Sequence, residues 1–361
     1  MSRPDLRELP AVRRLASEPG VHAVGGAVRD VLLGRAPREV DFVVDGDAVA
    51  LARRLGGEVT AHDRFGTATV RLGDEALDLA SARTERYPRP GALPEVRLGA
   101  TIADDLRRRD FTVNAIAVRL ADGERLAVPG ALDDLRAGVL RVLHEGSFED
   151  DPTRMLRMLR YGARLGFAPD AATAALAREA VAGGALATVS APRLGSELAL
   201  LLREPQPDAL VALGALAPGL LPGLDPDPSV IARALELAPP DARADLVALA
   251  AAFPGGHDEL EGRLRELGFP ARDAVLAARA AAGSDQEPLE AAVVAAARGS
   301  EAAGRWVDDL RYRRLAITGD DLLAAGLSGP AVGRGLAAAR AAMLDGSAPD
   351  RRTQLAVALR G

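Results

Sequence analysis

The pattern of apolar residues changes once along this chain, near Asp151, and that change limits the fold more than any other feature. Before it, six short apolar runs have the spacing and the turn-rich flanks typical of β-strands. They are VHAVGG (21–26), EVDFVV (39–44), TATVRL (67–72), ALDLASA (76–82), FTVNAIAVRL (111–120) and LRVL (140–143). After it the patterns are helical, beginning with residues 152–167, 170–182 and 191–203. We therefore predict an α+β head followed by all-α domains.

Two segments near the strands and one near the C-terminus have clear local signals. Residues 48–55 predict a helix that ends at Gly56-Gly57. The segment Tyr87–Gly99 contains three prolines and two glycines and predicts a mobile loop. Residues 317–346 predict two short helices around the Gly329-Pro330 turn.

The residue types that are missing exclude several chemistries. The 361 residues include no cysteine, which excludes disulfides and thiolate metal sites. All 45 basic residues are arginine, which excludes a P-loop lysine and a Schiff base. The net charge of −6 argues against a basic nucleic-acid binder as a whole, but arginines cluster locally, and the local patch matters more for contact with RNA.

The chain has no signal for a membrane or for export. No run of about 18 apolar residues is free of charges, proline and glycine, so we expect no membrane span. The N-terminal residues lack the apolar stretch of a secretory signal. A cytoplasmic protein is therefore expected.

A glycine pair lies between a predicted strand and a predicted helix in VHAVGGAVRDVLL. Gly25 and Gly26 allow a ligand to approach the backbone closely, and the free N–H groups of a helix start suit phosphate oxygens. Arg29 lies one turn into the helix, within reach of the same anion. A plain tight turn is the alternative interpretation of the pair.

Two acidic residues follow in the next predicted strand. Residues i and i+2 of a strand point to one face, so Glu39 and Asp41 are expected side by side. Carboxylates this close repel each other, and a divalent cation such as Mg²⁺ relieves the repulsion. Asp78 is the predicted third carboxylate, from a neighbouring strand, and Glu75 is a weaker candidate. A solvated strand end is the alternative, but the glycine turn just upstream favours the metal site.

Arginines concentrate in two later segments. In DLRRRDFTVNAIAV (105–118), Arg109 is a candidate to neutralise a triphosphate beside a metal site, with a solvated charge cluster as the alternative. In EDDPTRMLRMLRYGARLGF (149–167), Asp151 is the predicted N-cap and Pro152 the first helical residue. One face of this helix carries four arginines, namely Arg154, Arg157, Arg160 and Arg164. Because no acids lie between them for pairing along the helix, we favour an anionic or hydrogen-bonding ligand over a solvated basic face.

In this order, these motifs resemble the class II tRNA nucleotidyltransferases and poly(A) polymerases, the family of the CCA-adding enzymes. The similar stretches are GGAVRD, REVDFVV, SARTERY, RRDFTVNAIA, DDPTRMLRMLRYGARLGF and, in the tail, ITGDDLLAAGLSGPAVG. The resemblance is dense over 21–200 and thin over 205–310. It implies a polymerase-β-like nucleotidyltransferase head (1–147), a helical neck that binds the base (148–204), a helical body (205–312) and a helical tail that binds RNA (313–361).

The resemblance also implies roles for the candidate residues. Gly26 and Arg29, with Gly25 beside them, would bind the incoming nucleotide. Glu39 and Asp41 would hold Mg²⁺, with Asp78 as the third catalytic carboxylate. The phosphates and the base would be contacted by Arg109, Asp151, Arg154, Arg157 and Arg160. The implied reaction is attack of a tRNA 3′-hydroxyl on the α-phosphorus of CTP or ATP, with two metal ions.

The pair Asp151 and Arg154 suits selection of C and A without a template. Both bases present an exocyclic amine donor beside a ring-nitrogen acceptor, whereas uracil and guanine present the reverse. An aspartate only accepts hydrogen bonds and an arginine only donates them, so the pair matches C and A. A plain helix cap is the alternative role of Asp151.

The sequence departs from the family pattern at Glu39, where relatives usually have aspartate. The longer side chain puts the catalytic rate in doubt more than nucleotide binding. Two alternatives therefore stay open, a poly(A) polymerase of the same family and a non-catalytic RNA-binding relative. Within tRNA processing, the segment Glu85–Val96 is long enough for the flexible loop expected for A addition, which disfavours a CC-only enzyme.

Overall fold

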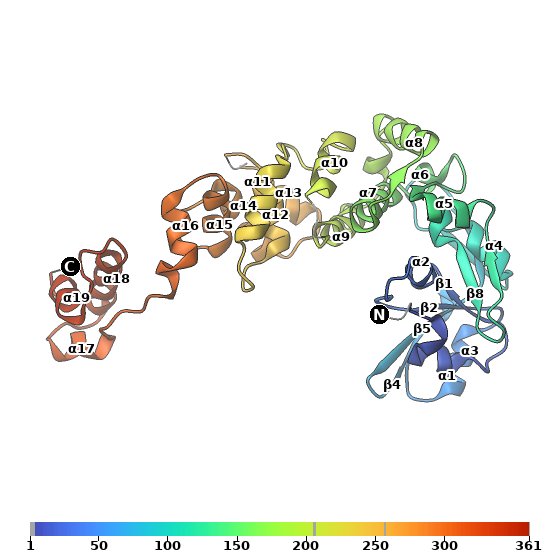
Figure 1. Cartoon of the computed structure of the whole chain (residues 1–361), viewed down its shortest axis with the longest axis horizontal. Helices are drawn as coiled ribbons and strands as arrows, with labels where there is room; N and C mark the ends of the chain where they lie inside the picture. The colour runs from blue at the N-terminus through green and yellow to red at the C-terminus, as the bar shows by residue number, and fades with distance from the viewer. Residues whose placement is uncertain (1–3, 205–206, 256–257, 361) are drawn as a thin grey trace.

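The computed structural model describes residues 4–204, 207–255 and 258–360. The molecule is elongated, with the β-strands gathered at one end and a small group of helices around the C-terminus at the other (Figure 1). Within the described residues, no helix is both long and apolar enough to cross a membrane.

The head contains a mixed sheet of seven strands in the order β3-β4-β5-β2-β1-β8-β9. Strands β2 and β5 are parallel, and all other neighbours in this sheet are antiparallel. The strands are β1 (Val21–Val24), β2 (Asp41–Val44), β3 (Glu58–His62), β4 (Thr67–Leu72), β5 (Glu75–Ser81), β8 (Ile116–Arg119) and β9 (Arg125–Ala127). Two short pairs lie outside it, antiparallel β6 (Arg83–Arg86) with β7 (Glu95–Leu98) and parallel β10 (Val139–Leu140) with β11 (Ala168–Pro169).

Helices accompany the sheet in the head, and the described chain after β11 contains helices without strands. Those of the head are α1 (Pro10–Leu15), α2 (Gly26–Leu32), α3 (Ala48–Leu55), α4 (Ile102–Arg107) and α5 (Ala131–Ala137). The next four are α6 (Ser147–Asp150), α7 (Thr153–Leu165), α8 (Ala171–Ala182) and α9 (Ala191–Leu202). Then follow α10 (Asp208–Leu216), α11 (Pro228–Leu237), α12 (Ala244–Ala251), α13 (Leu260–Glu266), α14 (Ala271–Ala282), α15 (Leu289–Ala297) and α16 (Glu301–Asp308). The last three are α17 (Gly319–Ala324), α18 (Pro330–Leu344) and α19 (Arg351–Ala358).

The central strand β2 is apolar on both faces because both faces are covered. Phe42 and Val44 belong to the larger head core, while Val43 belongs to a smaller core on the opposite face. This explains why the run reads as continuously hydrophobic. The apolar run begins directly after Asp41, the first residue of β2, so the strand holds a carboxylate at the edge of the sheet.

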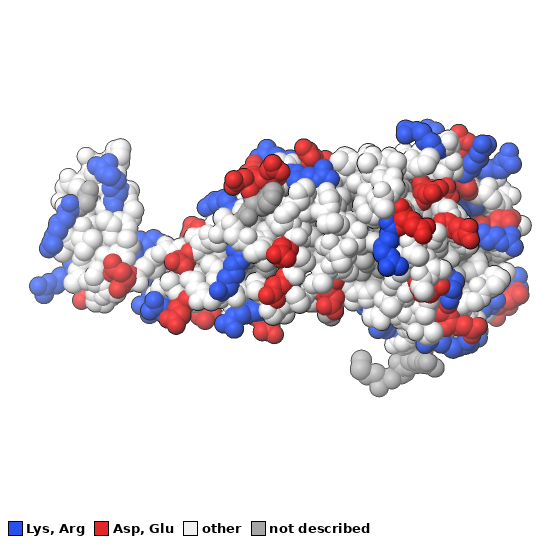
Figure 2. Space-filling model, turned by 90° about the horizontal axis from the view of Figure 1, so that it is seen from above, with Lys and Arg blue, Asp and Glu red and all other residues white. Residues whose placement is uncertain are grey.

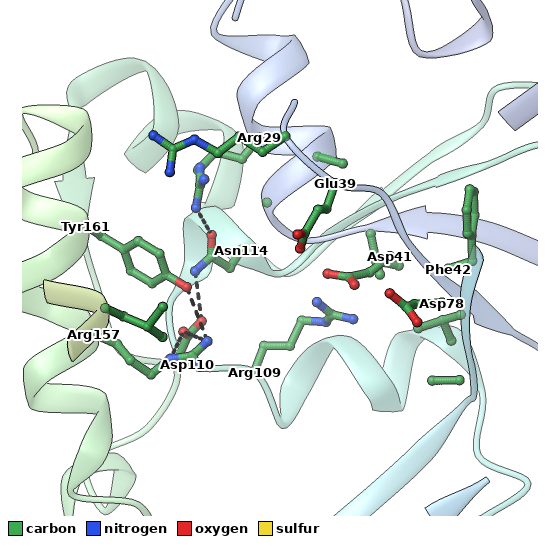
Figure 3. Close-up of a pocket in the computed structure, with 18 of the residues that line it drawn as sticks. Arg29, Glu39, Asp41, Phe42, Asp78, Arg109, Asp110, Asn114, Arg157 and Tyr161 are labelled. Atoms are coloured by element: carbon green, nitrogen blue, oxygen red, sulfur yellow. Dashed lines mark hydrogen bonds and ion pairs between the residues drawn. The ribbon is translucent and has the colours of Figure 1, made fainter. Parts of the chain in front are cut away.

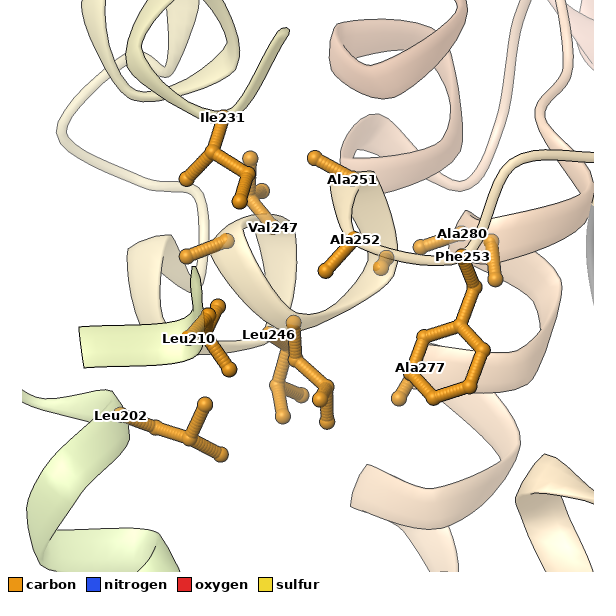
Figure 4. Close-up of a cluster of buried hydrophobic side chains, with 14 of the residues drawn as sticks. Leu202, Leu210, Ile231, Leu246, Val247, Ala251, Ala252, Phe253, Ala277 and Ala280 are labelled. Carbon is orange, nitrogen blue, oxygen red and sulfur yellow. The ribbon is translucent and has the colours of Figure 1, made fainter. Parts of the chain in front are cut away.

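Helix α7 joins the head to the helical part of the chain. Its Met155 and Met158 pack in the head core, whereas Leu156 packs in the core of the following helices. That second core is built from alanine-rich helices with larger side chains between them, such as Leu246 and Phe253 (Figure 4). A separate small core holds the C-terminal helices α17 to α19 together.

The predicted α+β class with an all-α continuation is confirmed, but several strand predictions need correction. Strand β2 begins at Asp41, so Glu39 precedes the strand instead of lying in it. Residues 95–98 form β7, so the prediction of a loop throughout Tyr87–Gly99 was wrong for that part. Strands β3, β6, β9 and β11 were not predicted. The domain boundaries stay predictions, and the one at residue 205 lies outside the described residues.

Candidate active site

A polar cleft of about 940 Å³ lies where the start of β2, the start of α2 and one side of α7 meet. Its lining includes all eleven residues predicted for the site, namely Gly25, Gly26, Arg29, Glu39, Asp41, Asp78, Arg109, Asp151, Arg154, Arg157 and Arg160. Residues from the first strand to the neck helix thus meet in one place, although their individual roles stay predictions. Glu75 is outside this cleft, and its carboxylate accepts from Arg14 at 3.0 Å.

Three carboxylates face the same part of the cleft. Asp41 of β2 and Asp78 of β5 are register partners on parallel strands, and Glu39 points toward them from the segment before β2 (Figure 3). Burial, and then the charges of Asp78 and Glu39, raise the pKa of Asp41, although Arg109 opposes this. Burial is the main cause of the raised pKa, and the two neighbouring carboxylates add to it.

The guanidinium of Arg109 lies beside these carboxylates (Figure 3). Its Nη2 donates to Asp105 Oδ2 at 3.2 Å, and burial lowers the pKa of Arg109 although Asp105 opposes the shift. The Nε atom is buried and has no hydrogen-bond partner among the described residues. A cation with an unused donor therefore faces a cluster of carboxylates.

Gly25 leaves the space that Arg109 occupies. Its φ of 65° and ψ of −129° form a conformation that side chains disfavour. A Cβ atom at this position would lie 2.8 Å from Arg109 Nη1. At Gly26 the nearest atom would be Arg29 Nη2 at 3.6 Å, an ordinary contact. The first glycine of the pair is thus required by geometry, for backbone conformation and for space.

Arg29 is buried and belongs to a polar chain that links α2 to α7. Its Nη1 donates to Asn114 Oδ1 at 2.6 Å, and its Nε donates to Asp30 Oδ1 at 2.9 Å. The Asn114 amide in turn donates to Asp110 Oδ1 at 3.0 Å, and Arg157 Nε donates to Asp110 Oδ2 at 2.8 Å (Figure 3). Arg29 therefore positions this network at the cleft wall as well as lining the cleft.

Asp110 is the centre of that network and is almost fully buried. Burial alone would raise its pKa, but the charge of Arg157 and hydrogen bonds from Asn114, Arg157 and the Phe111 N–H lower the pKa to about 2. Asp110 is ionised at neutral pH, and the same interaction raises the pKa of Arg157. An ion pair between the buried Asp110 and the partly exposed Arg157 thus connects the head to the neck helix.

The arginines on one face of α7 have more acidic partners than the sequence indicated. No acids occur along the helix, but they come from other elements. Glu197 of α9 accepts from Arg157 at 3.5 Å and from Arg160 at 3.4 Å. Asp30 of α2 accepts from Arg164 at 3.5 Å. The Tyr161 ring lies against three guanidinium groups, with centroid distances of 5.2 Å for Arg29, 5.8 Å for Arg157 and 4.9 Å for Arg160.

The start of α7 differs by one residue from the prediction. The helix begins at Thr153 with Pro152 at the cap position, and Asp151 lies one residue earlier. Its Oδ1 still accepts from the Thr153 N–H at 3.2 Å, so it satisfies a helix-start donor as expected of a cap. The same oxygen accepts from Arg193 Nη2 at 3.0 Å.

Arg154 is buried and already makes several hydrogen bonds. It donates to Ser147 Oγ at 2.6 Å, to the Arg108 carbonyl at 3.0 Å and to the Tyr87 hydroxyl at 3.5 Å. Burial raises the pKa of Tyr87 to about 12, so that hydroxyl is neutral. These contacts fix the Arg154 guanidinium in the wall of the cleft.

Sequence reasoning missed several polar residues of the site, namely Asp110, Asn114, Tyr161, Arg193 and Glu197. Asp110 and Asn114 lie within RRDFTVNAIA, so polar residues inside an otherwise apolar run were the available signal. Arg193 and Glu197 are four residues apart on a predicted helix, which places them on one face. Nothing in the sequence indicated that this face meets α7.

Comparison with known proteins agrees with the motifs. Residues 21–141 match the family described as the Poly A polymerase head domain. An A-adding tRNA nucleotidyltransferase of Aquifex aeolicus is 47% identical over 190 residues, which cover 51% of this chain and 23% of that protein. A CC-adding tRNA nucleotidyltransferase of Deinococcus radiodurans is 46% identical over 222 residues, which cover 59% of this chain and 58% of that protein. This chain therefore spans less than two thirds of these curated relatives.

Solved structures extend the similarity to the whole chain. A CCA-adding enzyme in an apo form has a TM-score of 0.79 and 28% identity, with 99% of this chain and 96% of that chain covered. A Thermotoga maritima CCA-adding enzyme complexed with tRNA has a TM-score of 0.75 and 27% identity over the same shares. The resemblance found in the motifs is confirmed: residues 21–141 match the Poly A polymerase head domain, and the chain as a whole has the fold of the CCA-adding enzymes.

Proposed function

We propose that this chain is a template-independent nucleotidyltransferase that adds C, A or both to the 3′ end of tRNA from CTP and ATP. The observation that carries the proposal is the single cleft in which three carboxylates lie beside a set of arginines. Carboxylates suit a metal ion and arginines suit a triphosphate, and a polymerising site requires both. The names of the relatives, which include A-adding, CC-adding and multifunctional CCA proteins, agree with this reaction class.

The donor set fits Mg²⁺. Glu39, Asp41 and Asp78 offer only hard oxygen ligands, and a cation would offset both the burial and the neighbouring charges that raise the pKa of Asp41. No group of three metal-ligating side chains is already drawn together among the described residues. When bound, the ion would lower the charge of the triphosphate and favour attack on its α-phosphorus.

The protein's own residues would do the rest of the work. Arg109 has its guanidinium beside the carboxylates and would donate to phosphate oxygens. In the reaction, the RNA 3′-oxygen forms a bond to the α-phosphorus, pyrophosphate leaves, and the hydroxyl proton is lost to solvent or a carboxylate. Arg157 and Arg160 line the same cleft with their charges partly balanced by Glu197, and would hold the triphosphate during this step.

Base choice is assigned to Asp151 and Arg154. Asp151 Oδ1 accepts from protein donors, but its Oδ2 receives no hydrogen bond from the described residues. That oxygen would accept from the exocyclic amine of cytosine or adenine. The three hydrogen bonds of Arg154 described above use Nη1 and Nη2, not Nε. The Nε–H would donate to the ring nitrogen beside the amine of cytosine or adenine.

RNA binding is assigned to the tail, residues 313–361. This segment contains seven arginines and four aspartates, a net charge of +3 in a chain of −6. Figure 2 shows several of these arginines on the surface at the end far from the head. Such a distribution favours contact with a polyanion that also reaches the cleft. The cytoplasmic location expected from the sequence also stays a proposal.

The test is incorporation of labelled CTP or ATP into three tRNA acceptors. The first lacks the whole 3′ CCA sequence, the second ends in C and the third ends in CC. The proposal predicts extension of at least one of these acceptors with Mg²⁺ and none with a chelator. Long A tracts on unrelated RNA would favour the poly(A) polymerase alternative. No incorporation on any acceptor, together with retained RNA binding, would favour the non-catalytic relative.

A further inference from the structure

Arg193 of α9 makes two hydrogen bonds to parts of the chain that are far apart in sequence. Its Nη2 donates to Asp151 Oδ1 at 3.0 Å, and its Nη1 donates to the Gly91 carbonyl at 2.8 Å. Asp151 is the acid just before α7, and Gly91 lies between β6 and β7. The rigid fork of one guanidinium therefore connects the hairpin to the acid at the cleft.

The contact with Arg193 determines how Asp151 presents its carboxylate. Oδ1 accepts from Arg193, from the Thr153 N–H at 3.2 Å and from Thr153 Oγ1 at 2.7 Å. Because all three donors meet the same oxygen, the rotation of the carboxylate is fixed. Oδ2 is then the acceptor that remains for a ligand in the cleft that Asp151 lines.

The hairpin end at Gly91 is fixed to the neck on its other side as well. The Gly91 N–H donates to the Glu149 carbonyl at 3.1 Å. Gly91 has a φ of 68°, and a Cβ atom there would lie 2.2 Å from Thr188 Oγ1 and 2.7 Å from the Thr188 carbonyl oxygen. The segment predicted to be a mobile loop is thus anchored at this glycine, with no room for a side chain.

We propose that Arg193 is a positioning residue for base selection, because it orients Asp151 toward nucleobases that present an amine donor and couples that orientation to the β6–β7 hairpin. The inference rests on the proposed function for its biological meaning. Its structural content is independent of that function, since both hydrogen bonds exist without a substrate. The ligand class is a nucleoside triphosphate whose base has an exocyclic amine beside an acceptor nitrogen, as in CTP and ATP.

The experiment compares wild type, Arg193→Ala and the matched control Arg178→Ala. Arg178 is an exposed arginine of α8 that donates to the Ala174 carbonyl of its own helix and is absent from the cleft lining. The first quantity measured is the preference for CTP over UTP, both in binding and in incorporation. The second is the rate of amide hydrogen exchange in residues 87–94. We expect Arg193→Ala to reduce the CTP preference at least about fivefold and to speed exchange in the hairpin, while Arg178→Ala changes neither.

The outcomes separate this inference from the proposed function. An Arg193→Ala protein with unchanged CTP preference, or with unchanged exchange at 87–94, overturns the inference. If the wild type prefers CTP in binding but incorporates nothing, the proposed function fails while the binding ratio and the exchange rates still decide the role of Arg193. A wild type that binds CTP and UTP equally overturns the inference as well. If Arg193→Ala does not fold, Arg193→Lys keeps the charge without the fixed fork and is judged by the same two measurements.

Discussion

Asp41 and Asp78 are register partners on the parallel strands β2 and β5, so the pairing of two central strands brings both carboxylates to one edge of the sheet. In a parallel pair, register partners point to the same face. The pKa of Asp41 is raised by burial and then by the charges of Asp78 and Glu39. An arrangement that opposes ionisation in this way is expected where a cation is needed for function.

Glu39→Asp should keep or raise activity when Mg²⁺ is limiting. Glu39 precedes β2 and is exposed, so the shorter carboxylate leaves the sheet unchanged and restores the ligand length usual in the family. The measurement is the initial rate of nucleotide incorporation over a series of Mg²⁺ concentrations. Loss of activity at every concentration would mean that the site is adapted to glutamate.

Gly25→Ala should be much more harmful than Gly26→Ala. The first substitution imposes a disfavoured backbone conformation, at a cost of about 1–3 kcal/mol, and places a methyl group 2.8 Å from Arg109 Nη1. The second meets only an ordinary contact and removes a glycine from a helix start. Thermal unfolding and CTP affinity of the two variants are the measurements. Equal effects in both variants would show that Gly25 does not position Arg109.

Asp110→Ala should lower the free energy of unfolding by about 1–3 kcal/mol, because it leaves Arg157 without its closest carboxylate and leaves the buried donors of Asn114 and Phe111 unpaired. The pKa of Asp110 is lowered to about 2, so the stabilisation is complete above its ordinary value near 4 and is lost as the pH falls toward 2. The difference between wild type and variant should therefore stay constant from about pH 7 to pH 5 and decrease below about pH 4.

The control for this prediction is Asp122→Ala. The pKa of Asp122 is also lowered to about 2, through a hydrogen bond with Arg119, but this pair is exposed to solvent. Its loss should change stability little, because water solvates both groups. Denaturant unfolding over a range of pH measures both variants, and a similar loss in the two would contradict the role given to the buried pair.

Asp151→Asn should reduce discrimination against UTP by about 1–3 kcal/mol. Arg193 and Thr153 donate to Oδ1, so the asparagine oxygen is expected at that position and its amide at the position of Oδ2. The amide then donates to the cleft, which suits the uracil carbonyl. Single-nucleotide incorporation with each of the four triphosphates measures the effect, and Asp150→Asn is the adjacent control outside the cleft lining. An unchanged CTP-to-UTP ratio would exclude Asp151 from base selection.

The sequence was sufficient for the parts of the site that follow from local patterns. A strand, a glycine pair and a helix predicted the position of Gly25, and the spacing of Glu39 and Asp41 predicted a carboxylate pair. The choice of Asp78 depended on strand pairing and agrees with the register of β2 and β5. Apolar runs with polar ends are typical of buried strands that end at a sheet edge, so local patterns were enough to propose these residues for one site, although Glu39 precedes the strand.

Other features were invisible because they depend on contacts between distant segments. Strand β3 lies at the edge of the sheet with mostly exposed side chains, so burial imposes no apolar pattern on EVTAH. The pairs Arg157 with Asp110 and Arg193 with Asp151 join residues more than 40 positions apart. The arginine face of α7 has no acidic partners within its own helix. Its partners include Glu197 of α9 and Asp110 of the segment before β8.

Asp41→Ala separates a metal-dependent nucleotidyltransferase from a protein that only binds RNA, because it removes the carboxylate proposed to hold Mg²⁺. Because the pKa of Asp41 is raised in the folded protein, its ionisation opposes folding above the ordinary pKa of an aspartate, so the variant should remain folded at neutral pH. We predict that wild type extends tRNA lacking its 3′ end with CTP or ATP and Mg²⁺. The variant, with unchanged far-UV circular dichroism, should lose at least about a hundredfold in rate. Extension by Asp41→Ala within a few-fold of the wild-type rate would contradict the account.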